Sequence, residues 1–346
     1  MENQRTELKD LGEFGLIDRI KERFPVSQPT SVLGIGDDAA ILAPGPGMQT
    51  VVSTDLLLEG IHFDLSFHPL PHLGYKAVAV NISDIAAMNA IPRQITVSIG
   101  LSNRFSLEAI DALYEGIQAA CNDFKVDLVG GDTTSSAAGL VISITAIGEA
   151  APEQLSRRDG AQKGDIICVT GDLGAAYLGL QVLLREKEAF KANPNMQPQL
   201  DDYEQLVGRQ LKPTARMDII HDLRDQKIVP TAMMDVSDGL ASELMHISRA
   251  SNLGVVVYEK NLPYTEDMNR TAVEEFKIDP LTVLLNGGED YELVFTIKQE
   301  DYEKIKNHPD VHLIGYMAEP DKGQVLVTKG EQIIPLKAQG WDHLKK

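Results

Sequence analysis

The sequence predicts a mixed α/β (α+β) protein of two domains, covering residues 1–150 and 151–346. The chain has 346 residues, enough for about two domains of ~100–200 residues each. Strand and helix patterns alternate in both halves, which is typical of mixed folds. The polar stretch AAPEQLSRRDGAQKGD, over residues 150–165, separates the halves and predicts the junction between the domains.

Apolar periodicity predicts the elements of the first half. Leu11, Ile17 and Phe24 lie at helical spacing and predict a helix over residues 11–24. Residues 74–91 read as a helix that is apolar nearly all round and therefore buried. Ser106 is placed to cap a third helix. Strands are expected at 49–53, 95–101, 127–129 and 140–148.

The second half repeats this alternation. Strands are expected at 166–170, 232–234 and 291–297, with a helix after Gly239. Glycine turns are expected at 171–174 and 286–289. The polar stretch 186–202, which contains two prolines, is expected to be a surface excursion.

Composition excludes several classes of protein. The formal net charge of −19 argues against binding nucleic acid or an anionic membrane, because both need basic patches. No apolar run approaches the ~20 residues of a membrane span, and the N-terminus MENQRTELKD lacks the pattern of a signal peptide. Cys121 and Cys168 are the two cysteines, too few for a disulfide scaffold, which fits a reducing cytoplasm.

Four short acidic motifs occur along the chain: Gly36-Asp37-Asp38, Ser53-Thr54-Asp55, Gly130-Gly131-Asp132-Thr133-Thr134 and Asp235-Val236-Ser237-Asp238-Gly239. Asp84, inside the predicted apolar helix, is a fifth acidic site. Three of the motifs follow directly on predicted strands. Strand ends are where side chains from different strands can converge on one ligand.

Few basic residues lie near these acids in the sequence. Lys76 is the only Lys or Arg between Val26 and Pro92, where there are six acids. Two carboxylates about 4 Å apart repel by ~4 kcal/mol at an effective dielectric near 20. A cluster of them needs raised pKa values or bound cations. Hard oxygen ligands favour Mg²⁺, Mn²⁺ or Ca²⁺, and single aspartates with Ser and Thr neighbours suit Mg²⁺ bound together with substrate phosphates.

Each candidate also has a plainer interpretation. Glycine–aspartate motifs occur in many tight turns, and Asp84 could bond a neighbouring segment instead of a metal. The coincidence of several such sites favours metal binding. The sequence has no P-loop and no protein-kinase motif set, so glycine turns at 130–132 and 171–174 are candidate phosphate cradles. Arg158 is a candidate phosphate clamp. Taken alone, His62, Glu289, Trp341 and Arg158 are interpreted more simply as ordinary surface or core residues.

The ordered set of motifs resembles bacterial thiamine-monophosphate kinase. The matching segments are GIGDDAA (34–40), STD (53–55), GIHF (60–63), AVNISDIAAM (79–88), GGDTT (130–134), DVSDGL (235–240), GGEDYEL (287–293) and GWDHL (340–344). They span essentially the whole chain. The last one departs from the family's usual ending, with Leu344 in place of phenylalanine.

The resemblance implies a fold and a set of residue roles. The N-terminal domain would join its twin in a homodimer through an intersubunit β-barrel, and the C-terminal α/β domain would complete each active site. Several Mg²⁺ ions would be held by Asp38, Ser53, Thr54, Asp55, Asp84, Asp132, Asp235 and Asp238. ATP would be contacted by Tyr114, Gly131, Asp132, Arg158 and Ser237. Thiamine monophosphate would be contacted by His62, Glu289 and Trp341.

The resemblance also implies the reaction. A phosphoryl group of ATP would pass directly, in line and with Mg²⁺ assistance, to thiamine monophosphate, giving thiamine diphosphate and ADP without a protein nucleophile. This is the last step of thiamine diphosphate biosynthesis.

Two alternatives stay open at this point. One is another ATP-dependent member of the aminoimidazole-ribonucleotide synthetase superfamily. The selenide-using member is disfavoured because no cysteine precedes Cys121. The other alternative is a non-catalytic nucleotide-binding module, which would keep the aspartates but would not need Glu289 or Trp341.

Overall fold

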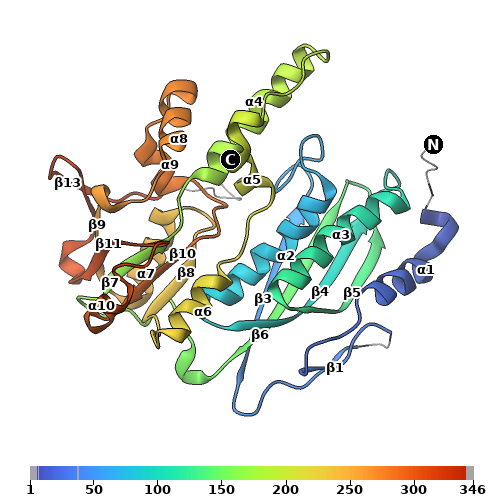
Figure 1. Cartoon of the computed structure of the whole chain (residues 1–346), viewed down its shortest axis with the longest axis horizontal. Helices are drawn as coiled ribbons and strands as arrows, with labels where there is room; N and C mark the ends of the chain where they lie inside the picture. The colour runs from blue at the N-terminus through green and yellow to red at the C-terminus, as the bar shows by residue number, and fades with distance from the viewer. Residues whose placement is uncertain (1–5, 7, 37–38, 340–346) are drawn as a thin grey trace. The chain divides into compact units, whose positions relative to one another are not determined.

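Helices and strands group into two units, each built around its own β-sheet (Figure 1). The computed structural model describes residues 6, 8–36 and 39–339. Unit 1 takes in the chain up to Ile85 together with Ala90–Glu153, and unit 2 takes in Ala86–Asn89 and the chain from Gln154 onward.

Unit 1 contains a four-stranded sheet with the order β3-β6-β4-β5. Its strands are β3 (Gln49–Leu58), β4 (Ile91–Leu101), β5 (Asp127–Ser135) and β6 (Val141–Ala150). β4 and β5 are parallel, and the other two pairs are antiparallel. A separate two-stranded ribbon joins β1 (Ser31–Leu33) to β2 (Ile41–Leu42). β3 and β5 are therefore the two edges of the sheet.

One face of this sheet is covered by α2 (Leu70–Ala87) and α3 (Leu107–Phe124), which lie side by side (Figure 1). The two helices approach closely because each carries a glycine at the crossing. A Cβ at Gly74 would lie 2.0 Å from the Leu113 carbonyl oxygen, and one at Gly116 would lie 1.8 Å from that of Pro71. Beneath the helices, alternate residues of β6 such as Ile144 are fully buried. α1 (Leu8–Arg23) precedes the sheet and has a kink at Gly12.

The opposite face of the sheet, here called the open face, exposes apolar side chains of β3. Val52 is 61% exposed and Leu56 is 52% exposed. Residues of a strand alternate between faces, so these two lie opposite Ser53 and Asp55. Two large apolar side chains on a sheet face are the kind of surface that a partner normally covers.

Unit 2 contains a seven-stranded sheet with the order β13-β12-β9-β11-β7-β10-β8. All its pairs are antiparallel except β12 with β9. Its strands are β7 (Ile166–Thr170), β8 (Ala232–Asp235), β9 (Gly254–Tyr258), β10 (Leu293–Ile297), β11 (Val311–Ala318), β12 (Gln324–Val327) and β13 (Ile333–Pro335). β7 and β8 both pair antiparallel with β10, so they run in the same direction and end at the same edge.

Helices complete unit 2. They are α4 (Ala175–Ala192), α5 (Glu204–Leu211), α6 (Met217–Asp225), α7 (Leu240–Ser251), α8 (Glu266–Arg270), α9 (Pro280–Asn286) and α10 (Tyr302–Ile305). Short turns of 3₁₀ helix occur in unit 2 at Asp201–Tyr203, Glu259–Asn261, Gln299–Asp301 and Pro320–Lys322, and a π-helix covers Thr271–Phe276; another 3₁₀ turn, Pro152–Gln154, lies at the boundary between the units. The core packs the inner faces of α4, α7 and α9 against β7, β8 and β10, with Val169, Leu244 and Val294 fully buried.

Most predicted elements are confirmed, but three strands are longer than expected, and β4 begins at Ile91, four residues before its predicted start. β3 continues through Thr54 and Asp55 to Leu58, and β5 continues through Gly130–Asp132 to Ser135. The predictions that Asp55 and Asp132 follow strand ends, and that 130–132 is a glycine turn, are therefore wrong. The predicted excursion at 186–202 begins as helix, because α4 extends to Ala192.

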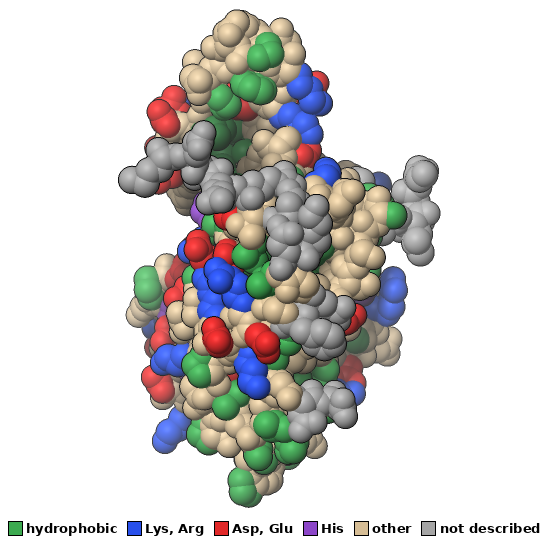
Figure 2. All heavy atoms as spheres, turned by 90° about the vertical axis from the view of Figure 1, so that its right-hand side faces the viewer, with side chains coloured by type: hydrophobic (Ala, Val, Ile, Leu, Met, Phe, Trp, Pro, Cys, Tyr) green, Lys and Arg blue, Asp and Glu red, His purple; other side chains and the backbone are tan. Residues whose placement is uncertain are grey.

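The structure can be compared with two expectations from composition: that the protein has no large basic surface and no membrane-spanning segment. On the face in Figure 2, outside the grey atoms, Lys and Arg side chains occur in small groups beside Asp and Glu and form no continuous basic surface. In the part of the chain that the structure describes, no helix combines the length and the hydropathy needed to cross a membrane.

Candidate functional site

An acidic pair in unit 1 joins β3 to α2. The Ser53 hydroxyl donates a hydrogen bond to Asp84 Oδ2, and the backbone N–H of Asp55 donates to Asn81 Oδ1 at 3.0 Å. Asn81 and Asp84 lie one turn apart on α2, so they share a face of that helix. The Asn81 amide is held in turn by the Ala77 carbonyl oxygen at 3.0 Å. The two carboxylates are therefore placed by a strand and a helix that pack together.

Burial and mutual repulsion act on this pair. Burial, and after it the charge of Asp84, raises the pKa of Asp55 to about 6. A cation bound beside such a carboxyl would stabilise its ionised form and lower its pKa. Among the described residues, no three His, Cys, Asp or Glu side chains come close enough to hold a metal by themselves. Two carboxylates with a hydroxyl fit Mg²⁺, which keeps several waters and takes one or two carboxylates.

The structure does not bring Thr54 or Asp132 to this pair within one chain. The Thr54 hydroxyl donates to the Ile144 carbonyl oxygen at 3.0 Å and accepts from Thr145 at 3.1 Å. Asp132 pairs with Ser98, which pairs with Ser143, which pairs with Leu56. Residues paired across a sheet lie on the same face, so Asp132 lies with Leu56 on the open face, opposite Asp55. Asp132 and Asp55 also occupy opposite edge strands, about 14 Å apart at ~4.8 Å per strand.

His62 and Tyr114 also belong to unit 1. His62 follows β3, and its Nδ1 accepts from the Leu58 backbone N–H at 3.0 Å. Tyr114 is 4% exposed in α3, with its ring edge-on to Phe24 at a centroid distance of 6.0 Å. Burial raises the pKa of its phenol. Asp38 lies outside the described residues.

The motif at 235–239 forms a tight turn in unit 2. β8 ends at Asp235, one residue beyond its predicted end. The Ser237 carbonyl oxygen accepts from the Glu289 backbone N–H at 2.7 Å, and the Val236 carbonyl oxygen accepts from the Tyr291 backbone N–H at 2.9 Å. Gly239 has a φ of 110°, which a residue with a side chain adopts only under strain. The two backbone hydrogen bonds join the turn to the loop that carries Glu289.

Glu243 belongs to this site, although the sequence reasoning missed it. Its side chain is 2% exposed, and its Oε1 accepts from the Asp238 backbone N–H at 3.1 Å. Burial, with the charges of Asp235 and Asp238 adding to it, raises the pKa of Glu243 to about 8. The sequence signal was an acid in the first turn of a helix that follows a polar turn.

Arg158 and Glu289 are the other predicted residues of unit 2 that lie near this turn. Burial, and after it the charge of Arg158, lowers the pKa of His246 in α7, and the same charge partly offsets the rise in the pKa of Glu243. Glu289 has a φ of 65°, and its Oε2 accepts from Gln210 Nε2 on α5 at 2.7 Å. Trp341, the third residue predicted to contact the substrate, lies outside the described residues.

At the predicted phosphate cradle, 171–174, both glycine N–H groups are bonded within the fold, that of Gly171 to the Asp310 carbonyl oxygen and that of Gly174 to Asp290. The turn exists, with a φ of 56° at Gly171 and 81° at Gly174. However, the Gly174 and Ala176 backbone N–H groups at the start of α4 donate to the Asp290 carboxylate at 2.5 and 3.1 Å. Burial raises the pKa of Asp290 to about 7. The start of α4 is therefore capped from inside the fold, and the two glycine N–H groups are not available to a phosphate.

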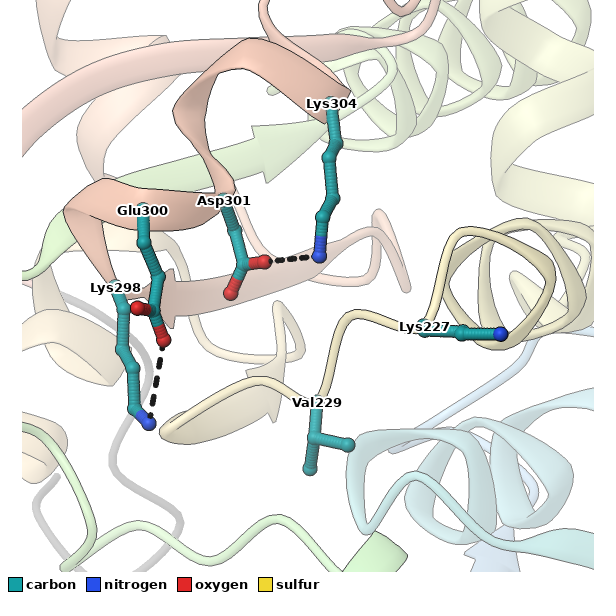
Figure 3. A pocket seen from close by; sticks show the side chains of 6 residues that line it. All are labelled: Lys227, Val229, Lys298, Glu300, Asp301 and Lys304. Atoms are coloured by element: carbon teal, nitrogen blue, oxygen red, sulfur yellow. Dashed lines mark hydrogen bonds and ion pairs between the residues drawn. The ribbon is translucent and has the colours of Figure 1, made fainter.

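Two surface clefts lie in unit 2 away from these aspartates. One, of about 420 Å³ and lined by Lys227, Lys298 and Lys304 among others, is shown in Figure 3. Lys304 lies 2.6 Å from Asp301 and Lys298 lies 3.6 Å from Glu300, while Lys227 points away from both acids. The other, of about 620 Å³, contains the buried Glu292–Arg216 ion pair. Neither is lined by a predicted metal ligand.

The predicted residues thus fall into three groups. Those brought together in unit 1 are Ser53, Asp55 and Asp84, and those brought together in unit 2 are Arg158, Asp235, Ser237, Asp238 and Glu289. Thr54, Tyr114, Gly131 and Asp132 lie elsewhere in unit 1, and His62 lies in the turn after β3.

Comparison with known proteins identifies the class. The N-terminal domain model of AIR synthase-related proteins matches residues 36–150, and the C-terminal domain model matches residues 162–328. The chain belongs to the AIR synthase-related family. A thiamine-monophosphate kinase from Bacillus subtilis (strain 168) is 36% identical over 342 residues, covering 97% of this chain and 100% of the relative. Within the family, the chain belongs to the thiamine-monophosphate kinases.

Solved structures agree. The crystal structure of thiamine-monophosphate kinase from Stenotrophomonas maltophilia K279a is 36% identical, with a TM-score of 0.77, and the match covers 92% of this chain and 97% of that one. The structure of AaThiL complexed with AMPPCP and TMP is 32% identical, with a TM-score of 0.74 and coverage of 99% and 100%.

Proposed function

We propose that this protein phosphorylates thiamine monophosphate to thiamine diphosphate, with ATP as the phosphoryl donor. The observation that carries the proposal is the Asp55–Asp84 pair with its Ser53 hydrogen bond. It is an oxygen-ligand set in a chain that matches thiamine-monophosphate kinases over its whole length. The names of those relatives supply the acceptor, and AMPPCP in a related complex supports a nucleoside triphosphate as donor.

Three roles are assigned to the residues of the site: metal binding, ATP binding and binding of the acceptor substrate. Ser53, Asp55 and Asp84 in unit 1, and Asp235 and Asp238 in unit 2, would hold Mg²⁺. When bound, Mg²⁺ supplies positive charge that offsets repulsion between the two phosphorylated substrates. Arg158 and Ser237 would bind ATP phosphates, since guanidinium and hydroxyl groups bond phosphate oxygens. Glu289, held by Gln210, would accept a hydrogen bond from the acceptor substrate.

Direct in-line transfer requires no protein nucleophile. The two thiols illustrate why none is nominated: Cys121 and Cys168 are buried, and burial raises the pKa of both. A buried neutral thiol is a poor nucleophile. Phosphoryl transfer depends mainly on positioning and charge stabilisation, and the acids and Arg158 provide these. The free thiols also suit the cytoplasm, where we propose that the protein acts.

We further propose that the active form is a homodimer joined through the open face of the unit 1 sheet. Val52 and Leu56, 61% and 52% exposed, lie on that face, and burying the part that is still exposed would contribute about 1–1.5 kcal/mol each. β3 and β5, the two free edges of the sheet, carry Asp55 and Asp132. In a β-barrel closed by two copies, β5 of one copy would lie beside β3 of the other. Asp132 of one copy would then come close to the strand that carries Asp55 in the partner.

Product analysis tests the proposed reaction. Purified protein is incubated with ATP and Mg²⁺, and with thiamine monophosphate, thiamine or an aminoimidazole precursor in parallel, and the products are separated by chromatography. We expect thiamine diphosphate from the monophosphate alone. Phosphorylation or ligation of the aminoimidazole precursor would indicate another superfamily activity. ATP binding without turnover of any acceptor would indicate a nucleotide-binding module.

A further inference from the structure

Glu243 reaches back from α7 to the turn that precedes the helix. It is the fourth residue of α7 and only 2% exposed. Its Oε1 accepts from the backbone N–H of Asp238 at 3.1 Å. The bond therefore connects a residue of the helix to the residue just before Gly239, which is the N-cap of α7.

The rest of the turn is fixed by other bonds. The carbonyl oxygens of Val236 and Ser237 accept from the backbone N–H groups of Tyr291 and Glu289. Asp238 and Gly239 follow these anchors. Gly239, with a φ of 110°, has the widest conformational freedom of any residue type. The Gly239 carbonyl oxygen in turn accepts from the Ser242 and Glu243 backbone N–H groups, so the Glu243 side chain holds Asp238, the residue between these two sets of anchors.

Glu243 is directed at a site, not only at a helix end. Asp235 and Asp238 are close enough for their charges to act on it, and so is Arg158. Asp238 itself is exposed while Glu243, which accepts its backbone N–H, is buried. This arrangement matches a residue that supports a ligand-binding side chain from behind.

We propose that Glu243 is a positioning residue for the phosphoryl-transfer site, because its carboxyl oxygen holds the Asp238 amide and so fixes the direction of the Asp238 carboxylate. The inference rests on the proposed function, in which Asp238 holds Mg²⁺. It assigns Glu243 no contact with substrate. What it requires is an acceptor oxygen at the right reach, and not a negative charge.

Two substitutions separate reach from charge. Glu243→Gln keeps the length and an acceptor oxygen but removes the charge. Glu243→Asp keeps the charge but shortens the side chain by about 1.5 Å, which puts the oxygen beyond hydrogen-bond distance of the Asp238 N–H. Glu243→Ala removes both.

A matched control removes a helix cap elsewhere in unit 2. Thr265 caps α8, and its hydroxyl accepts from the Met268 backbone N–H at 3.2 Å. Thr265→Ala should lower thermal stability, as any loss of a cap does, without changing metal binding. It measures what a purely structural role would do.

Titration calorimetry of Mn²⁺ into each variant, with a non-hydrolysable ATP analogue present, reports metal binding independently of turnover. We expect Glu243→Gln to bind Mn²⁺ within about threefold of the unsubstituted protein, and Glu243→Asp and Glu243→Ala to bind roughly tenfold or more weakly, the usual loss for a supporting residue. Thr265→Ala should bind normally. If Glu243→Ala does not fold, the Gln and Asp variants decide alone.

Two results would overturn the inference: Mn²⁺ affinity in Glu243→Asp equal to that of the unsubstituted protein, or a loss in Glu243→Gln as large as in Glu243→Asp. Failure of the proposed function looks different. In that case the unsubstituted protein forms no thiamine diphosphate, or Asp238→Asn binds Mn²⁺ as tightly as the unsubstituted protein does.

Discussion

The Ser53 hydroxyl donates a hydrogen bond to the Asp84 carboxylate, which ties the edge strand β3 to the buried helix α2. Both residues come from motifs that are 31 positions apart in the chain. A carboxylate within an apolar helix is costly to bury without such a partner. The bond therefore explains how Asp84 is tolerated there, and it places a second carboxylate beside Asp55.

Asp84→Asn should cut turnover by about 100-fold or more. The amide lacks the negative charge that would hold Mg²⁺, and Mg²⁺ would stabilise the charge of the transferred phosphoryl group. The fold should persist, since asparagine has the same size and can still accept from Ser53. Steady-state formation of thiamine diphosphate and circular dichroism measure the two effects. Asp111→Asn, which removes an ion pair of 2.6 Å with the half-exposed Arg19, is the control. Turnover of Asp84→Asn near that of the control would remove Asp84 from the site.

Asp55→Asn should raise the stability of the metal-free protein at neutral pH. The pKa of Asp55 in the fold is about 6, above the value of ~3.9 in an unfolded chain. The folded state therefore binds the proton more tightly, and stability falls as pH rises from about 4 to about 6. The loss is at most ~3 kcal/mol and is reduced by solvent screening.

Thermal melting with EDTA at two pH values checks this. At pH about 7.5 the Asp55→Asn protein should melt above the unsubstituted protein, and at pH about 4.5 the two should converge. Mg²⁺ should stabilise the unsubstituted protein more than the variant. A melting difference that is the same at both pH values would show that Asp55 is not the titrating group.

Val52→Glu with Leu56→Glu should convert the dimer to monomers. The two side chains are 61% and 52% exposed on the open face, and burying a carboxylate against a second copy is unfavourable. Light scattering gives the mass. Ile333→Glu, at a residue 71% exposed on β13 of unit 2, should leave the mass unchanged. A monomeric unsubstituted protein, or a dimeric double variant, would place the contact elsewhere.

Gly116→Ala should destabilise unit 1, because the new Cβ would lie 1.8 Å from the Pro71 carbonyl oxygen and force α2 and α3 apart. The cost should be about 1–3 kcal/mol, the usual range for overpacking. Gly208→Ala in α5 is the matched helical control. A Cβ there meets nothing within 4 Å, so stability should rise by about 0.5–1 kcal/mol. Denaturant unfolding measures both, and equal changes would show that the helices can adjust.

The helices could be predicted from the sequence because their signals are local. The apolar run around Asp84 predicted α2, although both of its ends lie four residues, about one turn, earlier than predicted, and the Ser106 cap predicted the start of α3. β8 and the turn at 235–239 were predicted for the same reason. Asp84 was singled out because a lone carboxylate among Ala77, Val80 and Ile85 calls for a partner.

The aspartates of β3 and β5 show where local reading failed. Gly130, Gly131 and Asp132 resemble a turn, but they continue a strand beside β4. Gly131 is required there by close approach, since a Cβ would lie 1.8 Å from the Val97 carbonyl oxygen. That contact depends on a strand some 30 residues away. Glu243 and Gln210 were missed for the same reason, because each is recognised only through the residue that it bonds.

The most direct test of the central claim is the amount of thiamine diphosphate that the purified protein forms from ATP and thiamine monophosphate, with Mg²⁺ and then with excess chelator. The account predicts one thiamine diphosphate per ADP in the presence of Mg²⁺, none with chelator, and recovery when Mg²⁺ is restored. A folded protein that binds ATP but forms no thiamine diphosphate, or one whose turnover is unaffected by chelator, would contradict it.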